Sequence, residues 1–269
     1  HYPLRRQRQM CIRDSAYTAN VEEYDGSSWS EVTNIPSARS FGGYGGTQTA
    51  AILFGGTTPV FAATLHYDGT NWTAGGDLGT ARYRIGGAGT QTAALGFGGY
   101  IPGAAVNVHT EEYDGSSWTD GGDLNTARSY LLSCSGIQTD AMAINGGSPY
   151  TDTTEIYNGS AWTAGSDTLF GNRGYVASAG TSTSALRLFT AGIASPSPRK
   201  SEESQTYDGS AFSTAPSLAT ARHTVTSAAA ATSATAMGYG GETVTGNSTA
   251  TEEFTAESTA LNLKTITDS

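Results

Sequence analysis

The chain has 269 residues, of which 35 are glycine and only 14% are charged, and its formal net charge is −10 at pH 7. Such an acidic surface repels nucleic acid and anionic membranes, so we expect neither as a partner. No apolar run approaches the roughly 18 residues of a membrane span, which argues against insertion into a bilayer. Abundant Thr, Ser, Gly and Ala without long Leu-rich runs favour many short strands over helices.

The first fifteen residues, His1 to Ser15, match nothing else in the chain. They hold four Arg and one Asp, and they lack the long apolar core of a signal peptide. The stretch from Met10 to Ser15 resembles a translated adapter end from sequencing libraries. We therefore predict that residues 1–15 are a non-native or disordered basic segment; a genuine basic tail is the alternative.

From residue 16 the chain consists of a repeat in which a tyrosine is followed by a turn and, five residues later, by a second aromatic residue. The clearest copy is Tyr113-Asp114-Gly115-Ser116-Ser117-Trp118. Related copies begin at Tyr24, Tyr67, Tyr157 and Tyr207, and a weaker one begins at Phe254. The Asp-Gly pair predicts a tight hairpin, and we expect the two rings to lie in the core. A spacing of about 43 to 50 residues marks a repeat architecture.

The order of features inside one repeat predicts four strands. An arginine opens the first strand, for example Tyr83 to Gly87, and a second strand, Ala93 to Phe97, ends in a double glycine. A loop of variable length leads to a third strand that ends in Tyr113, and the hairpin leads to a fourth strand at Trp118. Four strands in a unit of about 45 residues is what a propeller blade requires.

This pattern resembles the Kelch repeat, a family of β-propellers that includes the central domain of galactose oxidase. The shared marks are a double glycine that ends the second strand, a spaced Tyr and Trp, and an Arg before the next first strand. The double glycines are Gly55-Gly56, Gly98-Gly99, Gly146-Gly147 and Gly240-Gly241. The fourth copy departs with Ala191-Gly192 and with Phe212 in place of Trp, and the last has Thr259 where Trp is expected.

The resemblance implies an all-β fold over residues 16–269, a β-propeller of four-stranded antiparallel blades with five full blades plus a partial sixth. Residues 16–36 carry only the second half of a repeat, so we expect their join with residues 220–265 to be the weakest region. The blades also resemble those of Kelch-like proteins from environmental bacteria and their phages. That likeness implies an extracellular, cell-surface or virion location.

Comparison of the repeats with one another points to a binding face. Their lengths vary most in the loop between the second and third strands, whereas the hairpins keep a nearly constant length. Rigid scaffolds carry binding residues on such loops. The predicted ligand contacts in these loops are Phe61, Tyr100, Ile101, Tyr150, Arg199 and Lys200. The alternative is that the loops are solvated insertions without a ligand.

The arginines that open the repeats are a second candidate. They are Arg39, Arg82, Arg128, Arg173 and Arg222. On innermost strands they would form a ring in the central channel. We favour a structural role for them, in which they bind backbone carbonyls or carboxylates such as Asp77 and Asp123; the alternative is an anion site in the channel.

Motifs for catalysis and for metal binding are missing from the sequence. The four histidines, His1, His66, His109 and His223, lack metal-ligand spacing. The two cysteines, Cys11 and Cys134, make neither a disulfide framework nor a metal site. No phosphate-binding loop and no nucleophile elbow occurs. We therefore predict no catalytic residue, no metal and no cofactor.

The function that fits these observations is that of a non-enzymatic binding or structural propeller. It would recognise a protein or a glycan through the loops between second and third strands, as part of a cell-surface or virion adhesion component. The alternative is a propeller hydrolase or lyase that acts on polysaccharide. Such an enzyme needs convergent acids, and the candidate loops hold few of them: Asp152, Glu202, Glu203 and Glu242. A purely structural spacer is the third hypothesis.

Overall fold

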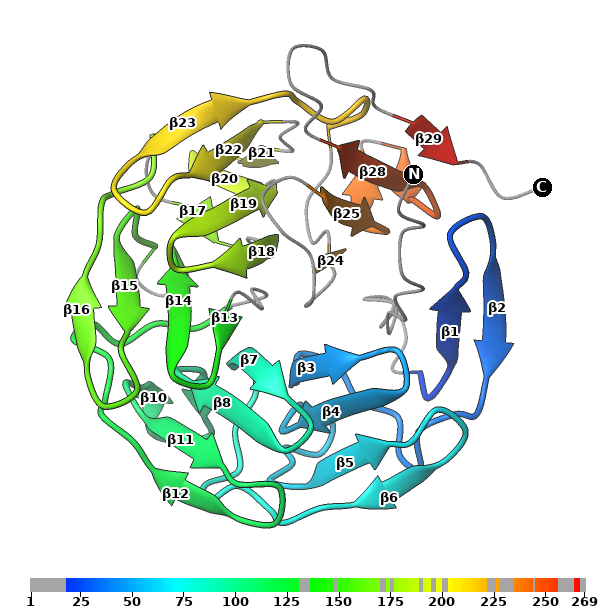
Figure 1. The fold of residues 1–269 in the computed structure, drawn as a ribbon, viewed down its shortest axis with the longest axis vertical. Helices are drawn as coiled ribbons and strands as arrows, with labels where there is room; N and C mark the ends of the chain where they lie inside the picture. The colour runs from blue at the N-terminus through cyan, green and yellow to red at the C-terminus, as the bar shows by residue number, and fades with distance from the viewer. Residues whose placement is uncertain are drawn as a thin grey trace.

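The computed structural model describes residues 18–130, 136–147, 150–169, 173–174, 177–188, 191–194, 197–199, 203–221, 226–227, 235–243, 245–255 and 264–266. Within these ranges the backbone forms strands and turns and contains no helix, so no described helix is long and apolar enough to cross a membrane. The sheets lie around a common centre with their first strands innermost (Figure 1). The predicted all-β propeller fold is confirmed, and residues 1–15 lie outside the described ranges.

The blades are four-stranded antiparallel sheets. One contains β3 (Gly43–Thr47), β4 (Ala50–Phe54), β5 (Thr64–Tyr67) and β6 (Trp72–Ala74). The next contains β7 (Gly86–Thr90), β8 (Ala93–Phe97), β11 (Thr110–Tyr113) and β12 (Trp118–Asp120). It is followed by β13 (Gly136–Ile137), β14 (Asp140–Ile144), β15 (Thr154–Tyr157) and β16 (Trp162–Ala164).

The second half of the chain continues the same strand order. One sheet contains β18 (Ala177–Thr181), β19 (Ser184–Leu188), β22 (Ser204–Tyr207) and β23 (Phe212–Ala215). Another contains β24 (Thr226–Ser227), β25 (Thr235–Tyr239), β28 (Thr251–Thr255) and β29 (Lys264–Ile266). At the start of the chain, β1 (Val21–Tyr24) and β2 (Trp29–Val32) form a two-stranded sheet. The predicted number of blades, five full and a partial sixth, stays a prediction.

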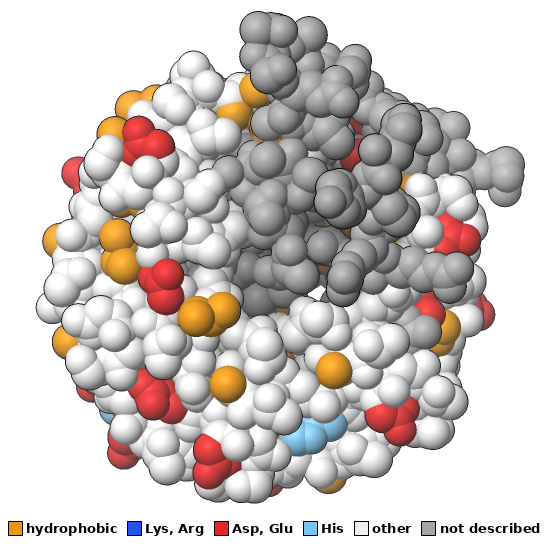
Figure 2. All heavy atoms as spheres, viewed as in Figure 1, with side chains coloured by type: hydrophobic (Ala, Val, Ile, Leu, Met, Phe, Trp, Pro, Cys, Tyr) orange, Lys and Arg blue, Asp and Glu red, His pale blue; other side chains and the backbone are white. Residues whose placement is uncertain are grey.

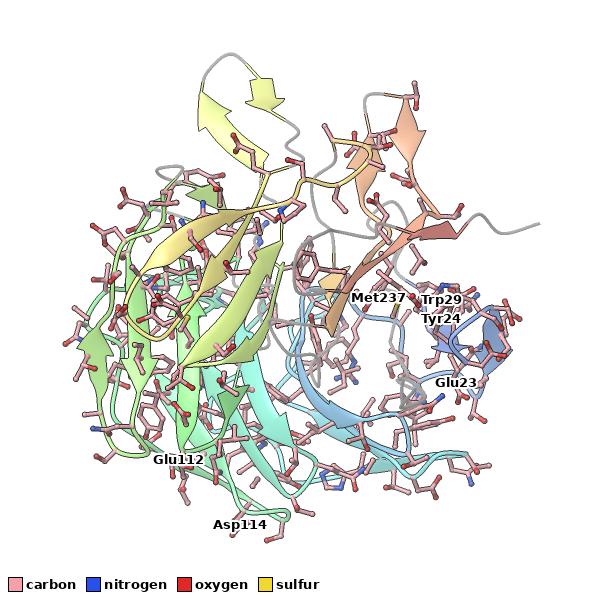
Figure 3. All side chains as sticks on the ribbon, turned by 45° about the horizontal axis from the view of Figure 1, so that its top comes forward. Glu23, Tyr24, Trp29, Glu112, Asp114 and Met237 are labelled. Atoms are coloured by element: carbon pink, nitrogen blue, oxygen red, sulfur yellow. The ribbon has the colours of Figure 1, made fainter. Side chains whose placement is uncertain are left out.

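The loops between second and third strands carry small additional strands. These are β9 (Tyr100–Ile101) with β10 (Ala105–Val106), β20 (Ala191–Ala194) with β21 (Ser197–Arg199), and β26 (Glu242–Thr243) with β27 (Gly246–Asn247). β20 also pairs with β17 (Arg173–Gly174), which precedes the first strand of its blade. In Figure 3 the β20–β21 hairpin projects from the upper end of the molecule, whereas Asp114 lies at the lower end. The variable loops and the Asp-Gly hairpins therefore occupy opposite faces of the ring.

The first strands begin later than the sequence predicts. We expected one from Tyr83 to Gly87, but β7 begins at Gly86. Tyr83 instead forms an isolated antiparallel bridge with Tyr100, and Arg84 has a φ of 56°. A left-handed residue cannot continue an extended strand, so the backbone turns between the arginine and the strand proper. The second strand, β8, has the predicted bounds.

Each Asp-Gly hairpin is held by the side chain of its first residue. In one of them, Asp114 Oδ1 accepts hydrogen bonds from the backbone N–H groups of Ser116 and Ser117, both at 2.8 Å. Gly115 has a φ of 98°, which glycine adopts without strain. The same side-chain bonds occur at Asp25, Asp68, Asn158 and Asp208. Because they favour the charged carboxylate, they lower the pKa of Asp114 to about 2.

The repeated aromatic pair joins each blade to the one before it. Tyr157 is fully buried and its ring centroid lies 5.0 Å from that of Trp162. Trp162 in turn lies 4.9 Å from Phe97 of the preceding blade and donates from Nε1 to Thr110 Oγ1 at 2.9 Å. A buried ring removes about 150–250 Å² from water, which contributes roughly 4–6 kcal/mol. Tyr157 and Trp162 are core, as predicted, and they also form the contact between blades, whereas Trp29, Trp72 and Trp118 at the equivalent position are half-buried.

A tyrosine hydroxyl strengthens this contact. Tyr157 donates to Glu112 Oε1 of the preceding blade at 2.5 Å, and burial together with this carboxylate raises the pKa of Tyr157 to about 12. At the join of the ring, Tyr24 donates to Glu253 at 3.3 Å, and Trp29 Nε1 donates to Thr251 Oγ1 at 2.9 Å. The β1–β2 hairpin thus contacts the last blade through the same kinds of bond that link the other blades. The expected weakness of the region where residues 16–36 meet residues 220–265 stays a prediction.

Replacing Asp114 by Asn should remove one source of acid sensitivity while keeping the acceptor oxygen. The folded-state pKa of about 2 lies below the ordinary 3.8, so the carboxylate stabilises the fold above pH 4 and this contribution is lost as the pH falls from about 4 to 2. We expect Asp114→Asn to show a smaller fall in Tm across that window and an almost unchanged Tm at neutral pH. Thermal unfolding followed by circular dichroism measures both.

Asp114→Ala is the matched comparison, since it removes the acceptor and should lower Tm at every pH. Identical pH profiles of Tm for Asp114→Asn and the unchanged protein would contradict the assigned role of the carboxylate.

Candidate ligand-binding face

The repeat arginines fasten both ends of the variable loops to the blades. Arg82 is fully buried, and its Nη1 donates to the carbonyl of Gly98 just after β8, at 3.0 Å, and to that of His109 just before β11, at 2.7 Å. Equivalent bonds join Arg39 to Gly55 and Ala63, and Arg128 to Asn145 and Thr153. Each of these three guanidinium groups, which we call the arginine clamps, therefore bridges the base of one loop.

A buried glutamate neutralises two of the clamps. Arg82 Nη2 lies 2.8 Å from Glu111 Oε1, and both side chains are almost fully buried. The other oxygen of Glu111 accepts from the backbone N–H of Gly79 at 2.7 Å. Arg128 and Glu155 form the same pair at 2.5 Å. The carboxylate thus ties the clamp to the chain segment that enters the blade.

The sequence suggested different carboxylates. In the described part of the chain, Asp77 and Asp123 form no ion pair with a clamp. Burial lowers the pKa of Arg39 and Arg82; the charge of Asp77 acts against this lowering at Arg39, and that of Glu111, with a smaller effect of Asp123, acts against it at Arg82. The glutamate at the second position of the third strand was missed, although it recurs in the repeats.

The three clamps are buried, because Arg39, Arg82 and Arg128 are at most 2% exposed. Their bonds lie at the end of the second strand and the start of the third, and the predicted ring of arginines in the central channel stays a prediction. Backbone carbonyls accept from Nη1 of each of these groups, and Glu111 and Glu155 neutralise Arg82 and Arg128. Arg173 is described only as backbone in β17, and Arg222 lies outside the described residues.

Two residues after each clamp stands a large side chain on a left-handed backbone. The φ angles of Phe41, Arg84 and Tyr130 are 56°, 56° and 59°. Such values are uncommon for residues other than glycine, and bulky side chains adopt them only where the surroundings enforce them. The same departure in consecutive blades fixes the direction of all three side chains.

Arg84 lies among aromatic rings contributed by neighbouring blades. Its Cζ is 3.9 Å from the ring centroid of Tyr130, 5.0 Å from that of Tyr83 and 5.5 Å from that of Phe41. Cation–π contacts of this kind contribute about 0.5–2 kcal/mol each. Its Nε is buried without an acceptor, and no carboxylate within the described ranges forms an ion pair with it.

Two residues predicted from the sequence, Tyr100 and Tyr150, lie in the same cluster. The ring of Tyr100 is 5.3 Å from that of Tyr83. A Cβ added to Gly147 would lie 2.8 Å from Tyr130 and 3.2 Å from Tyr150, so these two rings flank that glycine. Burial raises the pKa of Tyr150, and the charge of Arg84 opposes this rise. We call the half-buried set the Arg84 patch; its members are Phe41, Tyr83, Arg84, Tyr100, Tyr130 and Tyr150.

The other predicted contacts lie elsewhere. Phe61 stacks on the Arg39 clamp, with its ring centroid 4.1 Å from the guanidinium carbon. Ile101 is half-buried in β9, opposite Ala105. Arg199 is described only as backbone at the end of β21, and Lys200 lies outside the described residues. Both cysteines also lie outside them.

Four members of the patch were not among the contacts predicted from the sequence: Phe41, Tyr83, Arg84 and Tyr130. A signal was present, because a bulky side chain recurs two residues after the arginine in consecutive repeats.

Metal-binding geometry is not found in the described part of the molecule: no group of three or more His, Cys, Asp or Glu side chains is placed to hold an ion. Among the described side chains visible in Figure 2, the acidic ones are scattered and none is Lys or Arg.

Comparison with known proteins supports the fold. No protein-family model matches the chain, and no curated protein sequence does. Among solved structures 177 chains are similar. One of them, titled "Structure of YjhT", has a TM-score of 0.77 at 12% sequence identity, over 97% of this chain and 98% of that one. At such low identity the likeness shows a β-propeller and no function, and the Kelch-repeat type stays a prediction.

Replacing Glu111 by Leu tests the clamp. The blade of β3–β6 has Leu65 at the corresponding position. Removing the carboxylate leaves the buried charge of Arg82 without its counter-ion, and breaking a buried pair from one side costs about 3–5 kcal/mol. We expect the free energy of unfolding, measured by chemical denaturation, to fall by that amount.

Glu31→Gln is the control, because Glu31 is an exposed residue of β2, and it should change the free energy by no more than about 0.5 kcal/mol. The double variant Arg82→Met with Glu111→Leu measures the coupling between the two residues. Strict additivity of the single variants would show that the pair does not act as a unit.

Proposed function

We propose that the protein is a non-enzymatic binding propeller, which recognises a glycan or a protein through the face formed by the loops between second and third strands. The observation that carries this proposal is the Arg84 patch. Half-buried aromatic rings from neighbouring blades surround a cation that has no carboxylate partner in the described chain. Convergent aromatic and polar groups of this kind are the usual lining of binding sites.

The arginine clamps support the same proposal. Because a buried guanidinium holds both ends of a loop, the loop can differ in length and sequence without disturbing the blade beneath it. The small hairpins β9–β10, β20–β21 and β26–β27 are differences of this kind. A rigid scaffold with variable loops on one face suits recognition of a partner.

We also propose the finer architecture that the sequence suggested. The blades are Kelch-type repeats, five full and a partial sixth, and β1 and β2 supply the third and fourth strands of the partial blade. Tyr24 and Trp29 support this assignment, because they contact the last blade in the way that the Tyr and Trp of each other repeat contact the preceding blade. A role in adhesion at a cell surface or on a virion rests on the sequence resemblance alone.

Binding to an array of immobilised glycans and proteins tests the function. Tyr100→Ala and Tyr150→Ala should each weaken retention of the ligand roughly 30-fold, because a central aromatic contact is worth about 2 kcal/mol. Ile137→Ala is the control, since this residue is 55% exposed at the end of β13, next to the turn into β14 and away from the variable loops.

Two results would overturn the proposal. Release of soluble sugar from a polysaccharide would show an enzyme, a hydrolase or a lyase. Failure to retain any glycan or protein on the array would leave a structural spacer as the function.

A further inference from the structure

Arg84 differs from the clamp arginines in what surrounds it. Arg82 and Arg128 are fully buried and each is paired with a glutamate. Arg84 is half-buried and forms no ion pair within the described ranges, and its Nε lacks an acceptor, as the Nε atoms of Arg39 and Arg82 also do. Arg39 has no carboxylate partner in these ranges either, but its Nη1 donates to the carbonyls of Gly55 and Ala63. The immediate neighbours of Arg84 are aromatic rings. The site therefore places a positive charge close to the surface without supplying the negative charge that would neutralise it.

The composition of the chain makes this unpaired charge notable. Acidic residues outnumber basic ones, 24 to 14, so a carboxylate partner for Arg84 would be readily available among the residues of this protein. A guanidinium that is partly removed from water without a partner loses solvation, and the rings restore only part of it. A negatively charged ligand would restore the rest.

The geometry suits a carboxylate. Tyr130 lies against the guanidinium, with its ring centroid 3.9 Å from Arg84 Cζ, and within the described ranges no carboxylate forms an ion pair with the group. Carboxylates bind the N–H edge of a guanidinium with two parallel hydrogen bonds. The tyrosines around Arg84 offer ring faces for the C–H side of a sugar and hydroxyl groups for its polar side.

From these contacts we propose that Arg84 recognises the carboxylate of an acidic sugar, so that the ligand of the variable-loop face is a carboxylated glycan. The proposal rests on the binding function proposed above and narrows it to one class of ligand. Tyr83 with Tyr100 on one side, and Tyr130 with Tyr150 on the other, pack against the sugar ring, while Arg84 binds its acid group.

A purely structural role for Arg84 makes a different prediction. In that case the side chain would only hold Phe41 and Tyr130 of neighbouring blades together through cation–π contacts. Its replacement would lower stability and would weaken charged and uncharged ligands equally. The test must therefore measure a preference between ligands, not retention alone.

The experiment is an array that presents each carboxylated glycan beside its methyl ester, probed with the whole chain. The unchanged protein should retain the acids in preference to the esters. Arg84→Gln should reduce this preference by about 10- to 100-fold, the contribution of a charge-assisted hydrogen bond, and should leave weak binding of the esters as it was. Arg84→Lys, which keeps the charge without the planar fork, should retain part of the preference.

A salt titration of the unchanged protein provides a readout that needs no variant. Retention of the acids should fall as the ionic strength rises, and retention of the esters should not. The Tm of each variant is measured alongside, so that a loss of folding is recognised. If Arg84→Gln does not fold, the preference of Arg84→Lys for acids over esters and the salt titration show whether Arg84 recognises the carboxylate.

The outcomes separate this inference from the proposed function. Binding of glycans with equal affinity for acid and ester, or an acid preference that Arg84→Gln and salt leave unchanged, overturns the inference and keeps the binding function. Retention of acidic proteins only, with dependence on Arg84, overturns the choice of a glycan. Retention of nothing overturns both.

Discussion

A buried arginine side chain that bonds to both ends of a loop is the interaction on which the candidate binding face depends. Each clamp donates to one carbonyl just after the second strand and to another just before the third strand, as Arg82 does at Gly98 and His109. A guanidinium suits this task because its donors point in fixed directions and it stays charged when buried. The loop above is then free to vary, since its ends cannot move apart.

The aromatic contacts between blades serve a different purpose. Trp162 joins Phe97 and Thr110 of the preceding blade, and Trp29 joins Thr251 across the join of the ring. These contacts repeat around the propeller and hold the clamped loops side by side. The Arg84 patch depends on this arrangement, because its rings come from different blades and meet only when the blades are packed.

The patch also shows how one backbone conformation creates a possible site. After the clamp, the chain passes through a left-handed residue before the first strand begins, at Phe41, Arg84 and Tyr130. Because of that turn, the side chain of the left-handed residue points toward the equivalent side chains of neighbouring blades, and does not follow the alternating directions of side chains along the strand. Gly147 contributes by its lack of a side chain, since a Cβ there would meet the rings of Tyr130 and Tyr150. The left-handed backbone and the missing side chain at Gly147 thus allow the residues of the Arg84 patch, which are far apart in the chain, to pack together.

The repeat of Tyr, Asp-Gly and Trp by itself determined the all-β propeller fold, the hairpins and the aromatic core, because these features rest on local turn chemistry and on a pattern that recurs along the chain. It also placed Tyr100 and Tyr150 in variable loops. Only the tertiary structure decided that Arg82 pairs with Glu111 and not with Asp123, and that Arg84, two residues later, lies unpaired among rings. The two arginines look alike in sequence; their partners are set by a change of φ and by contacts between blades, which no local pattern records.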